Sequence, residues 1–236
     1  MSRLFGKLFY RMSKMDNNIN IAPKEDTIPY EEYGFLKYVD INLWSSFYYQ
    51  IFELLSITQK TDSILEVGKG TGVLGAVIKG LGFSYESMDI NPNLQPDHIG
   101  SVDKMPFGDK SYDIIGCFEV IEHLPYDKFT DALFELFRVA NKAVIISLPN
   151  AKRMIPFYVW VPKILRKKIL IPFPFYNPDN HPTDPAHHWE INREAHHFRQ
   201  IKDTMQEISN RYAFSFEREY RIWENPYHHL FVFYKK

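Results

Sequence analysis

The stretch "SILEVGKGTG", residues 63–72, decides the fold because a short apolar run passes directly into a glycine-rich loop. Residues 63–67 are apolar enough to form a strand buried on both faces, and a helix is expected near 72–81. Glycines in such a loop allow positive φ angles and let the main chain approach a ligand closely. A dinucleotide-binding loop needs the spacing G-x-G-x-x-G, but the count from Gly68 places Val73 at the last glycine position. The pattern therefore disfavours NAD.

Apolar runs and helical stretches alternate along the rest of the central region. Further strands are expected at 85–90, 112–118 and 143–148, and a second helix is expected near 127–140. This alternation predicts βαβ units. The fold class is therefore α/β, with a parallel sheet and right-handed crossovers.

A proline- and aromatic-rich insertion, residues 151–190, interrupts the alternation. A helix is expected from about 192 to 211, followed by strands at 214–223 and 228–236 that the sequence "ENP" joins. Close pairing through so short a turn would be antiparallel. The insertion is longer than an ordinary connection, and loops of that size usually cover a site. We therefore expect residues 151–190 to form a lid.

Length and composition indicate an ordinary globular chain. The 236 residues, of which 45% are hydrophobic, can bury a sizeable core. We expect an N-terminal helical cap over residues 1–60, which are rich in aromatic residues. The main α/β domain is expected over residues 61–236, with the insertion as part of it.

Charge and cysteine content indicate which classes of partner and which cellular compartment are expected. The formal net charge is -1 and the pI is near 6.8, which argues against a broad basic surface for nucleic acid. The single cysteine, Cys117, excludes an intramolecular disulfide and fits a reducing compartment. No uninterrupted apolar run reaches the roughly 18 residues that a bilayer span needs. We expect a cytoplasmic protein, and its oligomeric state stays open.

Two segments leave a peripheral membrane contact open. Four basic residues between positions 3 and 14 recur at nearly helical spacing opposite apolar ones, which is typical of a basic amphipathic helix. A helix packed on its own domain is the alternative. The second segment is the apolar insertion, which carries a basic cluster at residues 166–168.

Two carboxylates next to the glycine loop indicate what it binds. Asp89 stands at the end of the second predicted strand, 21 residues after Gly68, where it can accept both hydrogen bonds of a ribose diol. A pyrophosphate favours helix N-terminal amides. A zwitterionic sulfonium cofactor, by contrast, favours a carboxylate near its cationic end, and Glu66 suits that cofactor.

The order and spacing of these motifs resemble those of the class I S-adenosylmethionine-dependent methyltransferases, and of the type 11-like group among them. The resemblance covers about residues 60 to 150, through "ILEVGKGTG", "MDINP", "GSVDKMPFGDKSYDIIGCFEVIEHLP" and "VIISLPN". It implies a Rossmann-like fold with a mostly parallel seven-stranded sheet, an antiparallel C-terminal hairpin and helices on both faces. It also implies that residues 61–236 are the methyltransferase domain and that S-adenosylmethionine is the cofactor.

The resemblance assigns roles to individual positions. The glycine loop would approach the methionine end and the ribose, and Glu66 would lie beneath the amino acid moiety. Asp89 would bind the ribose hydroxyls, and the end of the strand at 112–118 would lie near the transferable methyl group. The residues implied to bind the cofactor are Glu66, Gly68, Gly70, Gly72, Asp89, Ile90, Val102, Asp103, Cys117 and Phe118.

The run "EVIEHLP", residues 119–125, follows that strand and is therefore expected beside the methyl donor. Together with histidines in the later segment 181–198, its side chains could hold Mg²⁺, Mn²⁺ or Zn²⁺, which would lower the pKa of a bound hydroxyl. The arrangement resembles the metal-dependent 3′-terminal ribose 2′-O-methyltransferases of small RNAs. That resemblance implies the metal ligands Glu119, Glu122, His123 and His187.

The same run has interpretations without a metal. Glu119, His123 and His187 are the candidate catalytic residues, and either histidine could be the general base because the pKa of imidazole lies near neutrality. Glu122 and His123 could instead hydrogen-bond loop backbone. Similar runs occur in ubiquinone-pathway and sugar-modifying methyltransferases, so the run does not identify the acceptor.

Three functions remain open from the sequence. The leading one is transfer of a methyl group from S-adenosylmethionine to an oxygen of a small-molecule, lipid-linked or glycan-linked acceptor. The first alternative is metal-dependent ribose 2′-O-methylation at an RNA 3′ end, against which stand the neutral net charge and the lack of a recognisable RNA-binding module. The second alternative is a non-catalytic partner protein that binds the cofactor, against which the intact Glu66, Gly68 and Asp89 argue.

Overall fold

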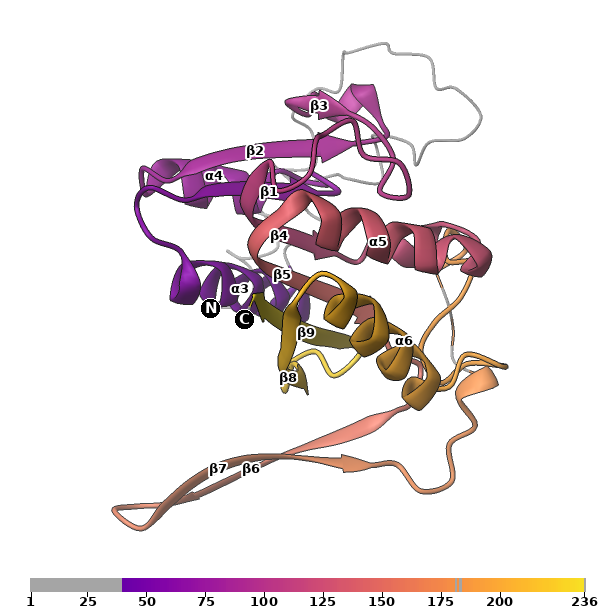
Figure 1. The fold of residues 1–236 in the computed structure, drawn as a ribbon. Coiled ribbons are helices and arrows are strands. Elements are labelled where there is room, and N and C mark those ends of the chain that lie inside the picture. The colour runs from indigo at the N-terminus through magenta and orange to yellow at the C-terminus, as the bar shows by residue number, and fades with distance from the viewer. Residues whose placement is uncertain (1–39, 181, 183, 236) are drawn as a thin grey trace, which may run out of the picture.

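The structure is a computed structural model that describes residues 40–180, 182 and 184–235. A seven-stranded sheet forms its centre (Figure 1). The expected basic amphipathic helix near the N-terminus and most of the expected cap lie outside the described residues. Within the described part of the chain, no helix is long and apolar enough to cross a membrane.

The parallel part of the sheet lies where the sequence predicts it. Its strands are β1 (Ser63–Val67), β2 (Ser84–Asp89), β3 (His98–Ile99), β4 (Tyr112–Phe118) and β5 (Ala140–Pro149). β1 pairs in parallel with β2 and β4, β2 with β3, and β4 with β5. β1 and β4 are buried along most of their length, as expected for strands that helices cover on both faces.

The last two strands, β8 (Phe214–Arg221) and β9 (His228–Lys235), complete the sheet. β9 pairs antiparallel with both β5 and β8, which gives the strand order β3-β2-β1-β4-β5-β9-β8. The predicted Rossmann-like α/β fold, with its seven strands and antiparallel C-terminal hairpin, is confirmed.

Helices cover both faces of the sheet, because side chains of β4 alternate between two apolar clusters. Ile114 faces the cluster under one helix pair, and Ile115 faces the cluster under the other. The first pair is α3 (Ile41–Ile57) and α4 (Val73–Gly80), and the second is α5 (Phe129–Val139) and α6 (Phe198–Arg211). Four short 3-10 turns, η2 (Pro92–Leu94), η3 (Ile121–His123), η4 (Tyr126–Lys128) and η5 (Pro178–Asn180), lie between them.

Polar contacts at both ends hold α3, the described part of the expected cap. The Asp40 carboxylate accepts a hydrogen bond from Asn42 N at 2.8 Å, which begins the helix. Farther along, the buried Glu53 carboxylate accepts hydrogen bonds from Arg218 and from the Tyr220 hydroxyl of β8, the latter at 2.7 Å. These contacts fix α3 against the sheet.

The insertion divides into two structural parts. β6 (Met154–Val161) and β7 (Leu165–Pro172) pair as an antiparallel hairpin that projects away from the sheet (Figure 1). The chain then returns, and His188 N donates a hydrogen bond to the main-chain oxygen of Glu122 at 2.8 Å. Residues 184–188 are therefore one part of the expected lid that contacts the predicted site.

One helix boundary and one short strand differ from the sequence prediction for physical reasons. The helix expected from about residue 192 begins at Phe198, because Asn192 and Glu194 have φ angles of 63° and 50°, which a right-handed helix excludes. β3 is not predicted, because its two residues are too few to show a period.

Candidate active site

A cavity of about 750 Å³ opens at the carboxyl ends of β1, β2 and β4. α3 borders it with Ser46 and Gln50, and the returning insertion borders it with residues 184–188. The carboxyl edge of a parallel sheet is where open α/β folds bind their ligands. The cavity therefore lies where the glycine loop and the acidic-histidine run were expected to meet.

The glycine loop between β1 and α4 needs its glycines for conformation and for space. Gly68, Gly70 and Gly72 have φ angles of 85°, 48° and 73°. A Cβ atom on Gly68 would lie 2.2 Å from Val120 Cγ2, so no larger residue fits there without movement. Gly68 and Gly70 line the cavity with main-chain atoms, whereas Gly72 is the N-cap residue immediately before α4.

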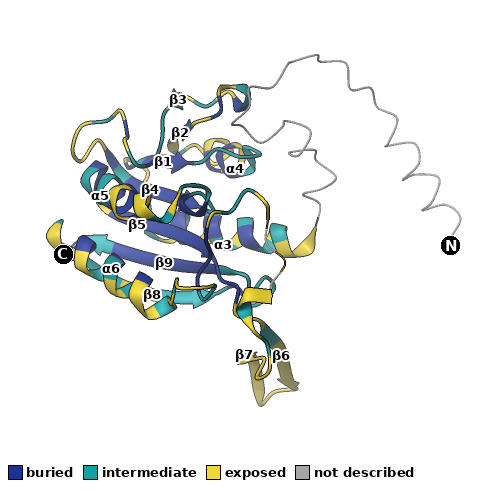
Figure 2. Cartoon of the chain, turned by 90° about the vertical axis from the view of Figure 1, so that its right-hand side faces the viewer, coloured by how far each residue is buried: buried dark blue, intermediate teal, exposed yellow. Residues whose placement is uncertain are grey.

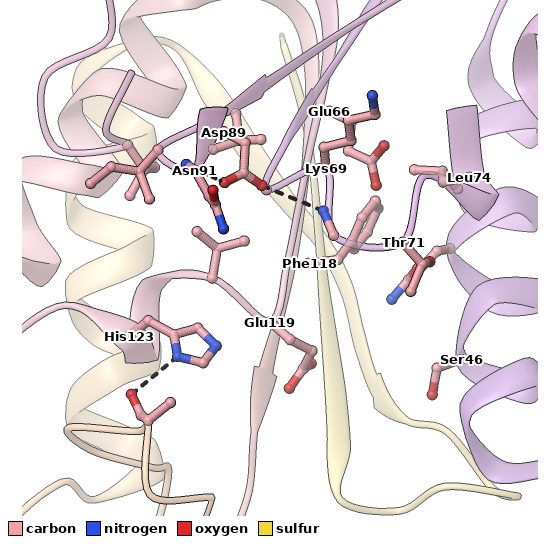
Figure 3. Close-up of a pocket in the computed structure, with 18 of the residues that line it drawn as sticks. Ser46, Glu66, Lys69, Thr71, Leu74, Asp89, Asn91, Phe118, Glu119 and His123 are labelled. Atoms are coloured by element: carbon pink, nitrogen blue, oxygen red, sulfur yellow. Dashed lines mark hydrogen bonds between the residues drawn. The ribbon is translucent and has the colours of Figure 1, made fainter. Parts of the chain in front are cut away.

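Two carboxylates border this loop. Glu66 lies at the cavity and accepts a hydrogen bond from the Tyr85 hydroxyl. Burial raises the pKa of Glu66 to about 8. The Asp89 carboxylate accepts hydrogen bonds from Asn91 N at 2.9 Å and from Gly70 N at 3.4 Å (Figure 3). Both carboxyl groups are therefore held by hydrogen bonds from neighbours at the cavity.

The structure separates the predicted cofactor positions into two groups. The first group lines the cavity and comprises Glu66, Gly68, Gly70, Asp89, Ile90, Val102 and Phe118. Gly72, Asp103 and Cys117 belong to the second group, which is absent from the lining. Asp103 accepts a hydrogen bond from the Ser101 hydroxyl, and Cys117 is fully buried in the core.

Some lining residues were not anticipated from the sequence. They are Ser46 and Gln50 of α3, Asn91, Tyr227 and His228. Asn91 could have been predicted from the sequence, because it belongs to the quoted motif "MDINP". The polar residues of α3 gave a weaker signal, namely polar side chains on the buried stripe of an otherwise apolar helix.

The chain turns sharply after β4 at Glu119. This residue has a φ angle of 52°, and its main-chain nitrogen donates to the oxygen of Ser147 at 3.1 Å. A left-handed conformation costs a non-glycine residue about 1–3 kcal/mol, and such strain clusters at functional sites. The turn leads into η3, which carries both Glu122 and His123.

Three of the four predicted metal ligands come together. One ligand atom each of Glu122, His123 and His187 lies within 4.8 Å of the others. Glu122 is fully buried, and neither of its carboxylate oxygens has a hydrogen-bond partner among the described residues. Burial, with the charge of Glu119 added, raises the pKa of Glu122 well above its usual range.

Hydrogen bonds orient both imidazoles of this cluster. His123 Nδ1 lies 3.1 Å from the main-chain oxygen of Ala186, which can only accept (Figure 3). His187 Nδ1 lies 3.2 Å from Glu190 Oε1, and that carboxylate also accepts a hydrogen bond from the Tyr227 hydroxyl at 2.6 Å. Both rings thus carry their proton on Nδ1, which leaves Nε2 with a free lone pair. His187 Nε2 lies 3.9 Å from Glu122 Oε1.

Glu119 lies outside the close group of Glu122, His123 and His187. Its Oε1 lies 3.6 Å from Nδ1 of His228, the first residue of β9. Burial raises the pKa of Glu119 to about 8, and burial together with the neighbouring His187 lowers the pKa of His228 to about 3. Glu119, His123 and His187, the three predicted catalytic residues, all line the cavity, and Glu122 does not.

The model of a family described as "Methyltransferase domain" matches residues 42–212. The chain belongs to this methyltransferase family. It is therefore an enzyme, and the resemblance to class I S-adenosylmethionine-dependent methyltransferases is confirmed. No curated protein matches the sequence of this methyltransferase.

Solved structures share the fold of this methyltransferase. Magnesium protoporphyrin IX methyltransferase from Synechocystis PCC 6803, with bound S-adenosylhomocysteine, has a TM-score of 0.54 and 13% identity and covers 98% of this chain and 95% of its own. The PH0226 protein from Pyrococcus horikoshii OT3 has a TM-score of 0.53 and 17% identity and covers 89% of this chain and 100% of its own. At these identities the likeness shows the fold alone.

The contact between Gly68 and Val120 predicts a difference between two glycine variants. Gly68→Ala is expected to lower the free energy of unfolding by about 2–4 kcal/mol, because a left-handed alanine is strained and its methyl group also meets Val120. Gly70→Ala has the same sign of φ but nothing within 4 Å, so about 1 kcal/mol is expected. Urea denaturation of both variants without ligand measures this, and equal losses would contradict the steric argument.

Proposed function

We propose that this methyltransferase transfers the methyl group of S-adenosylmethionine to a hydroxyl oxygen of a small-molecule or lipid-linked acceptor, beside a divalent metal ion. The observation that carries the proposal is the buried cluster of Glu122, His123 and His187. Its carboxylate has no hydrogen-bond partner in the described chain, and its two imidazoles offer free Nε2 atoms at the cavity.

The cavity fits the cofactor through its first group of residues. Gly68 and Gly70 present main-chain atoms, Asp89 offers a carboxylate for the ribose hydroxyls, and Glu66 lies where it can face the cationic amino acid moiety. Gly72 acts as the N-cap residue before α4, and Cys117 acts by packing behind the site. When bound, S-adenosylmethionine supplies the reactive methyl group next to the end of β4.

The chemistry of the cluster fits a metal ion. Neutral imidazole is the form that binds metals, and a second hydrogen bond from its other nitrogen is the usual support. His123 has this support from Ala186, and His187 has it from Glu190. Ligands at about 2.1 Å from an ion lie about 3–4 Å from one another, so an ion would draw the three groups, now within 4.8 Å, closer together.

The donor set also bears on the identity of the ion. Imidazole and carboxylate together suit Mn²⁺ or Zn²⁺ better than Mg²⁺, which prefers oxygen ligands. Glu119, the fourth predicted ligand, lies 3.6 Å from His228 and is not part of the close group. We therefore assign the ion to Glu122, His123 and His187.

Glu119 has the properties of a general base for this reaction. It lines the cavity, and its pKa of about 8 lies near neutrality, where proton transfer is most effective. The ion, when bound, lowers the pKa of the acceptor hydroxyl. Glu119 would take the hydroxyl proton as the acceptor oxygen bonds to the methyl carbon, while the bond from that carbon to the sulfonium sulfur breaks and S-adenosylhomocysteine leaves.

The lining of the cavity favours a small or lipid-linked acceptor over RNA. Lys69 is the one lysine or arginine among its described lining residues. RNA ligands are bound largely through phosphates, which need several cations. Ribose 2′-O-methylation at an RNA 3′ end therefore stays an outcome of the test rather than the proposal.

Replacing Asp89 tests the cofactor site. Asp89→Asn is expected to weaken the binding of S-adenosylhomocysteine by roughly 10- to 100-fold, because hydrogen bonds to a charged group contribute about 1.5–3 kcal/mol. Titration calorimetry measures the affinity. Asp131→Asn, on the exposed surface of α5, is the matched control and is expected to leave it unchanged. Failure of the unaltered protein to bind this ligand would contradict the cofactor assignment.

Methyl transfer itself tests the metal and the acceptor. With methyl-labelled S-adenosylmethionine and fractionated host extract, label is expected in the low-mass or lipid fraction, to be lost with EDTA and restored by Mn²⁺. Glu122→Gln is expected to lower this activity at least 100-fold because it removes an anionic ligand.

The control variant is His197→Gln, an exposed histidine outside the cluster, which is expected to keep full activity. Activity that chelation does not change would contradict the metal. Label found in RNA and abolished by prior periodate oxidation of the 3′ diol would replace the proposed acceptor with RNA.

A further inference from the structure

The hairpin of β6 and β7 exposes an apolar face. Residues that pair across two antiparallel strands share a face, and successive pairs alternate between the faces. The register therefore places the pairs Ile155–Ile171, Phe157–Ile169, Val159–Lys167 and Val161–Leu165 on one side. Six of the seven apolar side chains on this side are between 36% and 46% exposed. Figure 2 shows the hairpin standing out from the body as an exposed element.

The opposite face contacts the body of the protein at the pair Tyr158–Lys168. Tyr158 packs against the ring of Trp223 with centroids 6.3 Å apart, and Lys168 pairs with Glu224. Trp223 Nε1 donates to the main-chain oxygens of Phe157 and Ile169 at 3.2 Å each. These contacts anchor the middle of the hairpin, and the apolar side chains lie on the face away from Lys168 and Tyr158.

The charge of the hairpin has one sign. Residues 151–178 contain six lysines or arginines and no aspartate or glutamate. In the turn, Ile164 is 82% exposed and follows Lys163. Trp160, which pairs with Arg166 across the strands, is 57% exposed. Segments that lie in a membrane interface typically combine exposed apolar side chains with tryptophan and with lysine or arginine. The turn end of this hairpin has all three.

We propose that this hairpin docks the protein on an anionic lipid surface, with its turn and apolar face in the headgroup region and its cations against lipid phosphates. A second copy of the chain is a poorer occupant, because hairpin against hairpin would set cations against cations with no carboxylate between them. Nucleic acid would take the charge but would leave the apolar face exposed. Anionic lipid satisfies both features.

This inference goes beyond the proposed function and does not depend on it, because lipid binding needs no methyl transfer. The hairpin and the residues that border the cavity, such as His187, belong to the same insertion of the chain.

Flotation of the full chain with vesicles tests the proposal. Vesicles of phosphatidylcholine with about 30% phosphatidylglycerol are expected to carry the protein, and pure phosphatidylcholine much less, because anionic lipid attracts clustered lysine and arginine. Arg166→Glu with Lys167→Glu is expected to weaken binding at least tenfold. Val159→Ser with Leu165→Ser keeps the charge and is expected to weaken binding to a similar degree.

The matched control changes the same net charge elsewhere. Arg199→Glu with Arg211→Glu, on the exposed face of α6, is expected to leave vesicle binding within twofold of the unaltered protein. Retained binding of S-adenosylhomocysteine shows that each variant is folded. No binding to anionic vesicles would overturn the proposal, and so would binding that the hairpin variants leave unchanged. A dimer that the hairpin variants abolish, without vesicle binding, would identify a second copy as the occupant instead.

Discussion

The parallel pairing of β1 with β2 and β4 is the constraint on which the site depends. The register sets Val67 beside both Met88 and Cys117, so the three strands end together at one edge of the sheet. Glu66, Asp89 and Glu119 stand at those ends, although they are far apart in the chain. β2 alternates between buried and exposed residues, so a one-residue shift of its register would expose Tyr85 and Ser87, and the pairing at this edge is therefore specific.

Main-chain conformation at this edge then decides what each group can reach. Gly68 passes close to Val120, which lets the loop border the cavity, and the left-handed Glu119 turns the chain into η3. The returning insertion approaches from the other side and brings His187 to Glu122. The cavity and the cluster of Glu122, His123 and His187 therefore lie at the same strand ends. Their closeness is the reason for the proposal that links a metal ion to methyl transfer.

Local patterns predicted the parts that depend on neighbours in sequence. The strand at 63–67, the glycine loop and Asp89 follow from hydrophobic runs and turn chemistry. The roles of Glu190 and Tyr227 could not be predicted, because they arise only when the insertion and the β8–β9 turn fold back on η3. The hairpin also escaped prediction, since its prolines and unbroken apolar runs hide the alternation of a strand.

The central claim is that the buried carboxylate and two imidazoles beside the donor cavity bind a metal ion. Anomalous X-ray scattering from crystals grown with Mn²⁺ and S-adenosylhomocysteine tests it most directly. The account predicts a manganese peak within bonding distance of Glu122, His123 and His187. Ligand density in the cavity without such a peak, and with Glu122 hydrogen-bonded to ordered water instead, would contradict it.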